Sequence, residues 1–262
     1  MLKQFMEPGD EQQLNFLPGT QNQNKTFVSR KQCVLSAIES QLNEIKKNDP
    51  NKRVGFVLFS NEVTIVGDGV AESVHIVGDR LNKVQEVIGA LAAFKLTAPL
   101  ADTYDPLIKE LNKAEAKGQT ALGPALVASI QVASQGSKGS TVVLCTDGLA
   151  NIGVGNLEAA NEASEKFYLD VAAEAKSKNV AVSVITIKGE SSKLEILGKV
   201  VEATNGNVKV VNPEKLSDDF ANILKDEVIG LNVSSRIMLH KALVFRNEDA
   251  GNLKDNKTIL VK

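Results

Sequence analysis

The sequence predicts an α/β protein whose sheet is doubly wound, mostly parallel and bounded by one antiparallel edge strand. Short apolar, β-branched runs such as 141–146 and 180–187 alternate with segments in which apolar residues recur at helical spacing. This alternation predicts parallel strands with helices on both faces, a Rossmann-like arrangement. The runs 53–60 and 63–66 are separated by two residues, which predicts an antiparallel hairpin.

The same patterns divide the chain into three parts. Residues 1–28 are polar and rich in Gln and Asn, which predicts a loop or a disordered arm. Residues 29–227 hold the α/β domain. Residues 228–262 alternate in part and predict a β segment, the start of a β-rich unit that ends in mid-strand. Helices are expected over 29–48, 79–94, 104–116, 121–134, 157–177, 192–203 and 213–225, and further short strands over 74–77 and 208–211.

Composition bounds the class of protein. Of 262 residues, 43% are apolar and 24% charged, which is ordinary for a soluble globular chain. The net charge of −2 argues against a nucleic-acid partner. Neither a secretory signal nor an apolar run of membrane-spanning length is found, so we expect a cytoplasmic protein without a membrane partner. Cys33 and Cys145 are expected on a helix and in a central strand, as small hydrophobic residues rather than a disulfide.

Two stretches place polar groups where a parallel sheet binds ligands. Asp147 and Gly148 follow the buried run 141–146, and Thr120 stands at the expected start of a helix. Ligands bind outside the carboxyl ends of parallel strands, so these positions are candidate site residues. Each has a simpler reading, because Thr120 suits a helix N-cap and Asp147-Gly148 suits a tight turn.

Together these stretches resemble the von Willebrand factor A (vWA) family. The stretch GQTALGPAL at 118–126 is similar to the family's threonine loop, and VVLCTDGLANIGVG at 142–155 is similar to its fourth strand and aspartate loop. The likeness covers about 29–225 and is nearest to intracellular vWA proteins of single-celled eukaryotes. It implies a non-catalytic protein-interaction module with a partial metal-ion-dependent adhesion site. By the resemblance, Thr120 and Asp147 would hold Mg²⁺ or Mn²⁺ weakly and leave room for an acidic side chain of a protein ligand.

The resemblance lacks one part, the family's first strand and its D-x-S-x-S loop. The apolar run Leu14–Leu17 is short, and Pro18-Gly19 ends it without Asp or Ser at the required places. We expect that the chain begins just after the missing motif, in preference to natural degeneracy. In that fold the first strand is central, and its absence leaves neighbouring strands with unpaired groups, each costing about 1–3 kcal/mol. A chain of marginal stability, or self-association through the unpaired sheet gap, is therefore expected.

The alternative function is a metal-dependent hydrolase or a nucleotide-binding enzyme that uses Asp147. The pair Gly153 and Gly155 suggests a dinucleotide loop, but Glu158 occupies the third glycine position, so turn geometry is the favoured role of these glycines. Other polar residues have plain readings. His75 and His240 are expected to be structural or surface residues, and Asp102 and Asp105 to be solvated loop carboxylates.

Overall fold

The computed structural model divides the chain into two compact units, Met1–Glu227 and Val228–Lys262, and each is described by itself. The structure describes residues 30–114, 118–136, 139–146, 149–158, 162–187, 194–211, 218, 221–223, 235–246, 253–255 and 258–261. The expected arm at 1–28 lies outside these residues, as does most of the helix expected over 213–225, of which 218 and 221–223 are helical.

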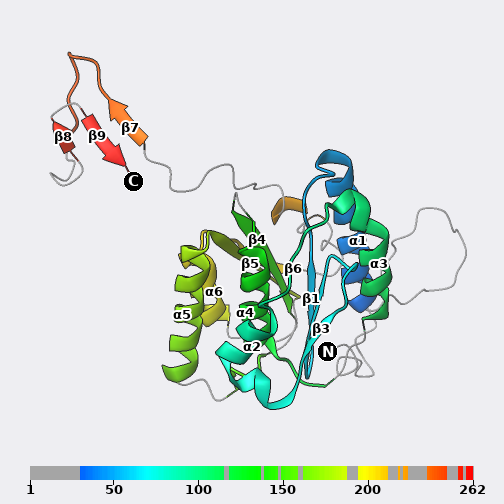
Figure 1. Cartoon of the computed structure of the whole chain (residues 1–262). Helices are drawn as coiled ribbons and strands as arrows, with labels where there is room; N and C mark the ends of the chain where they lie inside the picture. The colour runs from blue at the N-terminus through cyan, green and yellow to red at the C-terminus, as the bar shows by residue number, and fades with distance from the viewer. Residues whose placement is uncertain are drawn as a thin grey trace, which may run out of the picture. The chain divides into compact units, whose positions relative to one another are not determined.

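The first unit is an α/β domain, as predicted (Figure 1). Its strands are β1 (Phe56–Phe59), β2 (Val63–Gly67), β3 (Val74–Ile76), β4 (Ser140–Thr146), β5 (Val180–Ile187) and β6 (Val208–Val211). Its helices are α1 (Arg30–Asn48), η1 (Gly78–Asn82), α2 (Val84–Ala90), α3 (Leu100–Lys113), α4 (Leu122–Ala133), α5 (Glu162–Ser177) and α6 (Leu194–Ala203).

Three predicted helix boundaries differ from the structure. The helix expected over 79–94 is a 3-10 turn and a short α-helix, separated at Lys83, whose backbone is extended. The helix expected from 104 begins at Leu100, because Pro99 holds an extended backbone that ends the preceding irregular segment. Helix α5 begins at Glu162 instead of 157, since the loop before it is occupied by the turns around Gly153 and Gly155.

The strands form two sheets of three. Strands β4, β5 and β6 are parallel, with Ser140 opposite Val180 at one end of the β4–β5 pair and Thr146 opposite Thr186 at the other. Strands β1, β2 and β3 are antiparallel neighbours, so β2 is the reversed strand and β3 lies outside it. Among the strands that the structure describes, β1 and β4 are not paired with each other.

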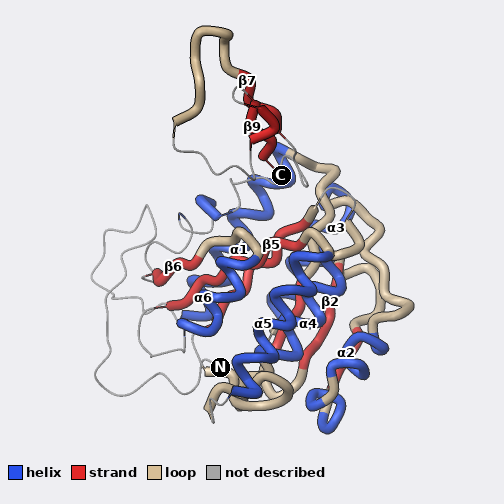
Figure 2. The backbone as a smooth tube through the Cα atoms, turned by 90° about the vertical axis from the view of Figure 1, so that its left-hand side faces the viewer, coloured by secondary structure: helices blue, strands red, loops and turns tan. Residues whose placement is uncertain are grey.

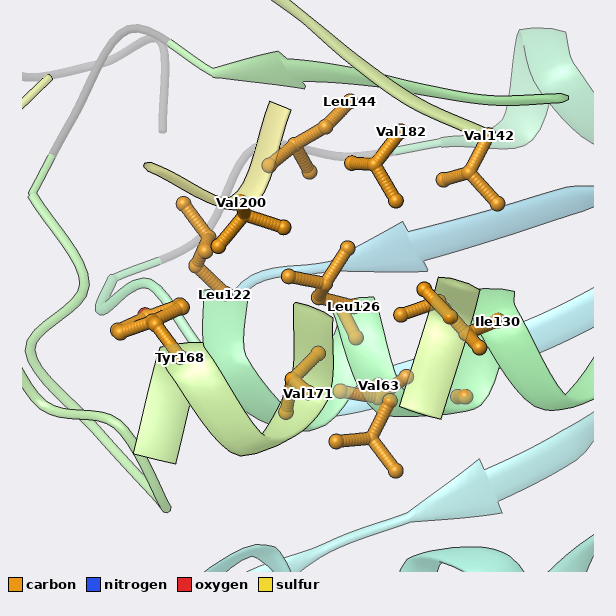
Figure 3. Packing of buried hydrophobic residues seen from close by; sticks show 14 of the residues in the cluster. Val63, Leu122, Leu126, Ile130, Val142, Leu144, Tyr168, Val171, Val182 and Val200 are labelled. Atoms are coloured by element: carbon orange, nitrogen blue, oxygen red, sulfur yellow. The ribbon is translucent and has the colours of Figure 1, made fainter. Parts of the chain in front are cut away.

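Helix α4 joins the two sheets on one face. It packs against β1, β2 and β4, and its residues from Leu122 to Ala128 are buried all round. Leu126 is fully buried and lies between Val63 of β2 and Val182 of β5 in the main core (Figure 3). Helix α5 packs beside α4 and α6 on this face (Figure 2). The main core therefore belongs to both sheets.

Helix α1 packs against both sheets on the opposite face, and α3 lies beside it (Figure 1). Its first half packs Ala37 against Ile185 and Val211 of the parallel sheet. Its second half packs Leu42 in a cluster with Phe56 of β1 and with α3. On each face, therefore, one helix packs against both sheets: α4 on one face and α1 on the other.

The second unit contains the β segment that the sequence predicts after 228. Strands β7 (Ser235–Met238), β9 (Thr258–Val261) and β8 (Leu253–Asp255) form an antiparallel sheet in that order. Ile237 stands opposite Ile259, which stands opposite Leu253.

Candidate functional site

The threonine loop is held at the carboxyl end of β1. Gly118 has a φ of +58°, a conformation that favours glycine, and it turns the chain toward Thr120. The side chain of Thr120 is 5% exposed. The N-cap of α4 is Ala121, and no side chain caps it, so the reading of Thr120 as a helix N-cap is wrong. Instead, Ala121 N donates a hydrogen bond to Ser60 O at 2.8 Å.

Asn151, in the loop after β4, closes this arrangement from the other sheet. Thr120 N donates to Asn151 Oδ1 at 2.6 Å, and Asn151 N donates back to Thr120 O at 3.1 Å. Asn156 Nδ2 in turn donates to Asn151 O at 2.9 Å. The asparagine side chain therefore replaces a backbone partner for a buried N–H, which would otherwise be costly to leave unpaired.

We call the set Ser60, Thr120, Ala121 and Asn151 the carboxyl-edge bridge. It links the end of β1 to the loop that follows β4, through the residues that precede α4. Because the carboxyl ends of both strands meet the start of the same helix, β1 and β4 run in the same direction. The edge at which the sequence places Thr120 is therefore a single surface shared by both sheets.

Of the two metal ligands that the resemblance implies, the structure describes only Thr120. Thr120 lies at the carboxyl edge, whereas Asp147 lies outside the described residues. No group of three or more His, Cys, Asp or Glu side chains suited to a metal occurs in the part of the chain that the structure describes. The carboxyl-edge bridge offers hydroxyl and amide oxygens without a carboxylate, and Mg²⁺ favours carboxylate ligands completed by waters. The bridge residues alone do not fit a magnesium site.

The two glycines of the same loop have the turn geometry that the sequence favours. Gly153 and Gly155 have φ values of +80° and +73°. A Cβ on Gly153 would lie 2.8 Å from Leu81 O, and one on Gly155 would lie 2.4 Å from the ring of Phe167. Both glycines thus allow the loop to pack closely against protein atoms, and α5 begins only at Glu162. Nothing in this geometry favours a dinucleotide at the glycines.

Two expected loop carboxylates are helical. Asp102 and Asp105 are exposed, as predicted, but they lie within α3. Leu100 N donates to Lys52 O at 2.8 Å, which places the start of α3 beside the residues that precede β1. These carboxylates therefore lie toward the amino end of β1, away from the carboxyl-edge bridge.

Both histidines are exposed, as predicted. His75 Nδ1 lies 3.1 Å from Thr64 Oγ1 on the neighbouring strand, where the two residues form a cross-strand pair. In the second unit, His240 Nδ1 accepts a hydrogen bond from Ala242 N at 3.2 Å. Each histidine is occupied in a local structural contact.

The cysteines lie where the sequence places them, unpaired, on α1 and β4. Both side chains pack in the cluster between α1 and the parallel sheet. Burial raises the pKa of the Cys145 thiol to about 12, so it is protonated and unreactive at neutral pH. Burial also raises the pKa of Cys33.

A search of the described helices for one long and apolar enough to cross a membrane found none.

Comparison with known proteins adds one sequence relative and several structural ones. No family model matches the chain. It is 32% identical over 230 residues to the "Circularly permutated Ras protein 1" of Dictyostelium discoideum, a match that covers 86% of this chain and 27% of that protein. The chain thus spans about a quarter of the length of the curated relative it matches.

The solved structures of similar fold include a von Willebrand factor type A protein and a VWA domain. The von Willebrand factor type A protein from Catenulispora acidiphila superposes with a TM-score of 0.53 at 16% identity, covering 81% of this chain and 42% of that one. The SpRpn10 VWA domain superposes with a TM-score of 0.48 at 15% identity, covering 78% of this chain and 87% of that one. The first match and the threonine and glycine loops at the carboxyl edge lead to one conclusion. The chain has the fold of the von Willebrand factor A domain.

Proposed function

We propose that the chain is a non-catalytic protein-interaction module that binds its partner at the carboxyl edge of its two sheets. The observation that carries the proposal is the carboxyl-edge bridge, which fixes loops from three parts of the chain against one another. A binding surface built from fixed loops loses little conformational entropy when a partner docks. Asn61 and Gln119 are exposed beside the bridge and offer hydrogen-bonding side chains to that partner.

The proposal includes a weak divalent-cation site. Its ligands are Thr120 and Asp147, with waters and one acidic side chain of the protein partner completing the coordination of Mg²⁺ or Mn²⁺. The bridge supports this proposal by fixing the backbone of Thr120 on both sides. The cytoplasmic location expected from the sequence is part of the same proposal, as is the absence of nucleic-acid and membrane partners.

A matched pair of surface variants tests the docking edge. Asn61 and Asn51 are both exposed and lie just beyond opposite ends of β1. Proteins retained by the full chain from extract would be identified and their binding then measured with purified partner. We expect Asn61→Arg to abolish that binding and Asn51→Arg to leave it unchanged. Equal effects of the two variants on every partner would contradict the proposed edge.

Thermal melting with and without divalent cations tests the metal site. Mg²⁺ or Mn²⁺ at 100 times its Kd would stabilise the folded state by about 2.7 kcal/mol relative to chelator. The gain should vanish in both Asp147→Ala and Thr120→Val. A gain that persists in both variants would place the cation elsewhere, and no gain in the unaltered chain would leave a metal-free docking edge.

A further inference from the structure

Strand β3 has no strand partner on one side of its backbone in the described part of the chain. It is last in the order β1-β2-β3, and it pairs with β2 without a bulge. Native proteins normally protect such an edge with lysine, proline, a bulge or a covering segment. From Val70 to Val77 the chain has neither lysine nor proline, and these two valines are 65% and 47% exposed. Apart from its short length, β3 therefore has few of the features that prevent pairing with another strand.

A groove lies beside this free edge. It has a volume of about 380 Å³ and lies between the start of β3 and the segment that includes the end of α2. Glu72 and Val74 line one wall, and Ala90, Phe94 and Lys95 line the other. Most of the lining side chains are apolar, so the groove suits an apolar side chain of a ligand.

The wall that carries Phe94 is fixed by contacts within the chain. Gln135 Nε2 donates to Phe94 O at 2.8 Å, and Leu96 N donates to Gln135 Oε1 at 3.0 Å. The Phe94 ring lies against Gly67 of β2, where an added Cβ would be 2.2 Å from Phe94 Cζ. A ligand therefore meets a preformed wall and loses little affinity to ordering it.

The groove is separate from the carboxyl-edge bridge. Gly67 is paired with Phe56, the first residue of β1, whereas the bridge contains Ser60, which follows the last residue of β1. The groove thus lies toward the amino end of β1, and the two surfaces share no residue.

We propose that β3 and this groove bind an extended segment of a partner protein, which adds to the sheet as an antiparallel strand. Backbone hydrogen bonds to β3 supply the affinity, and the groove selects an apolar side chain. Residues directly opposite on neighbouring strands share a face, so the partner residue opposite Val74 directs its side chain into the groove. The antiparallel direction continues the pairing of β1, β2 and β3.

Charge defines the partner segment further. Glu72 is exposed and lies two residues before Val74, and neither it nor Lys95 is in an ion pair with another described residue. In an antiparallel partner, the residue opposite Glu72 follows the apolar groove residue by two positions. Because opposite charges on paired strands attract, that residue is Lys or Arg. The segment is therefore an apolar residue, any residue, and then a basic residue.

Titration of the full chain with blocked heptapeptides, followed by NMR, tests the proposal. The probes are Thr-Val-Thr-Phe-Thr-Lys-Thr and two peptides with Leu or Ile in place of Phe. At least one should bind with a Kd below about 1 mM and slow hydrogen exchange in β3. Methylating the amide nitrogens of every second residue should abolish binding for one of the two alternating sets only, because alternate N–H groups face β3. No binding by any probe, or equal binding of the two methylated sets, would overturn the proposal.

A matched pair of variants tests the groove. Ala93 lines it and Ala92 does not, and both are exposed. Ala93→Arg should weaken peptide binding at least about tenfold and Ala92→Arg less than about twofold, because only the first fills the groove. Glu72→Lys should weaken binding of the original probe roughly threefold and favour a probe with Glu in place of Lys. Equal effects of the two alanine variants, or no change in charge preference, would contradict the proposal.

The chain without peptide distinguishes the other occupants of the edge. We expect β3 to show outward-facing amides that exchange freely in a sample confirmed to be monomeric by sedimentation. A dimer that the peptide dissociates would assign the edge to a second copy of the chain. Outward-facing β3 amides that are already protected in the monomer would assign it to another part of this chain. Either result would overturn the assignment to a partner protein.

Discussion

The two sheets share one core but are stabilised differently. The parallel sheet has its longest pairing between β4 and β5, and α5 and α6 pack with β5 on one face. The antiparallel sheet has shorter strands, of which β3 has three residues, and it depends on α4 for its main helical cover. Since α4 contributes to both sheets, neither is an independent folding unit. Cooperative unfolding of this domain therefore depends more on the packing of α1 and α4 against both sheets than on continuous strand pairing.

Removing packing at the shared helix should have the largest effect. Leu126→Ala leaves a cavity between β2 and β5 and should lower the free energy of unfolding by about 2–5 kcal/mol. Urea unfolding followed by circular dichroism should show a single transition at a lower midpoint. Leu169→Ala on the exposed side of α5 is the control, with an effect within about 0.5 kcal/mol. Two separate transitions in Leu126→Ala would show that the sheets unfold independently.

The carboxyl-edge bridge is the next most sensitive link between the sheets. Asn151→Ala removes the acceptor of the Thr120 N–H, which is buried, and should cost about 1–3 kcal/mol. Asn51→Ala, at an exposed position near the amino end of β1, should cost less than about 0.5 kcal/mol. The measurement is urea unfolding of both variants under the same conditions. Equal stabilities would mean that the bridge adds nothing to the link that α4 already provides.

The face of the parallel sheet under α1 can be probed through pH. The folded pKa of Cys145 is about 12, above that of the unfolded chain, so its contribution is complete below pH 8.5 and falls as the pH rises toward 12. In a Cys33→Ser background, stability should fall by up to about 1 kcal/mol between pH 8.5 and 9.5. Adding Cys145→Ala should remove this dependence. A loss of the same size in both proteins would assign the titration to other groups.

Two helical glycines, one in a helix beside each sheet, allow a matched test of the two sheets with small expected effects. Gly89 in α2 and Gly198 in α6 each have open space where a Cβ would be added. Each change to Ala should raise stability by about 0.5–1 kcal/mol, because the unfolded chain loses freedom. Gly206→Ala is the opposite case, since its Cβ would lie 1.9 Å from Val182 O and must destabilise. If Gly89→Ala slows hydrogen exchange only in residues near α2 and does not raise the free energy of global unfolding, the antiparallel sheet opens independently of the parallel sheet.

Much of the fold could be predicted because its signals are local. The apolar runs that became β4 and β5 lie at the predicted positions, and so does α4. The break at Lys83 and the early start of α3 depend on contacts with distant residues, such as Leu100 N with Lys52 O. The prediction that Asp102 and Asp105 lie in a loop was therefore wrong, because their spacing is compatible with a helix as well as with a polar loop.

The candidate site was predictable only in part for the same reason. Thr120 was found from its motif, whereas Asn151 was given no role, although it lies in the stretch that carries the resemblance. Its side chain accepts a hydrogen bond from Thr120 N, 31 positions away in the sequence, and no periodicity or spacing predicts such a bond. The available signal was a polar residue in the loop after one strand, which the fold brings beside the loop that precedes a helix. Asp147 lies outside the described residues and stays a prediction.

The complete burial of α4 has a consequence during synthesis. Its partners β1 and β2 precede it in the chain, but β4 and the residues of β5 in the same core cluster follow, so part of its apolar surface has no cover until Ile187 has been made. A nascent chain that ends before this point presents a continuous apolar helix to its surroundings. Such surfaces are the ones that aggregate or recruit chaperones. The interval between the synthesis of residues 133 and 187 is therefore the stage at which the nascent chain is most exposed to misassembly.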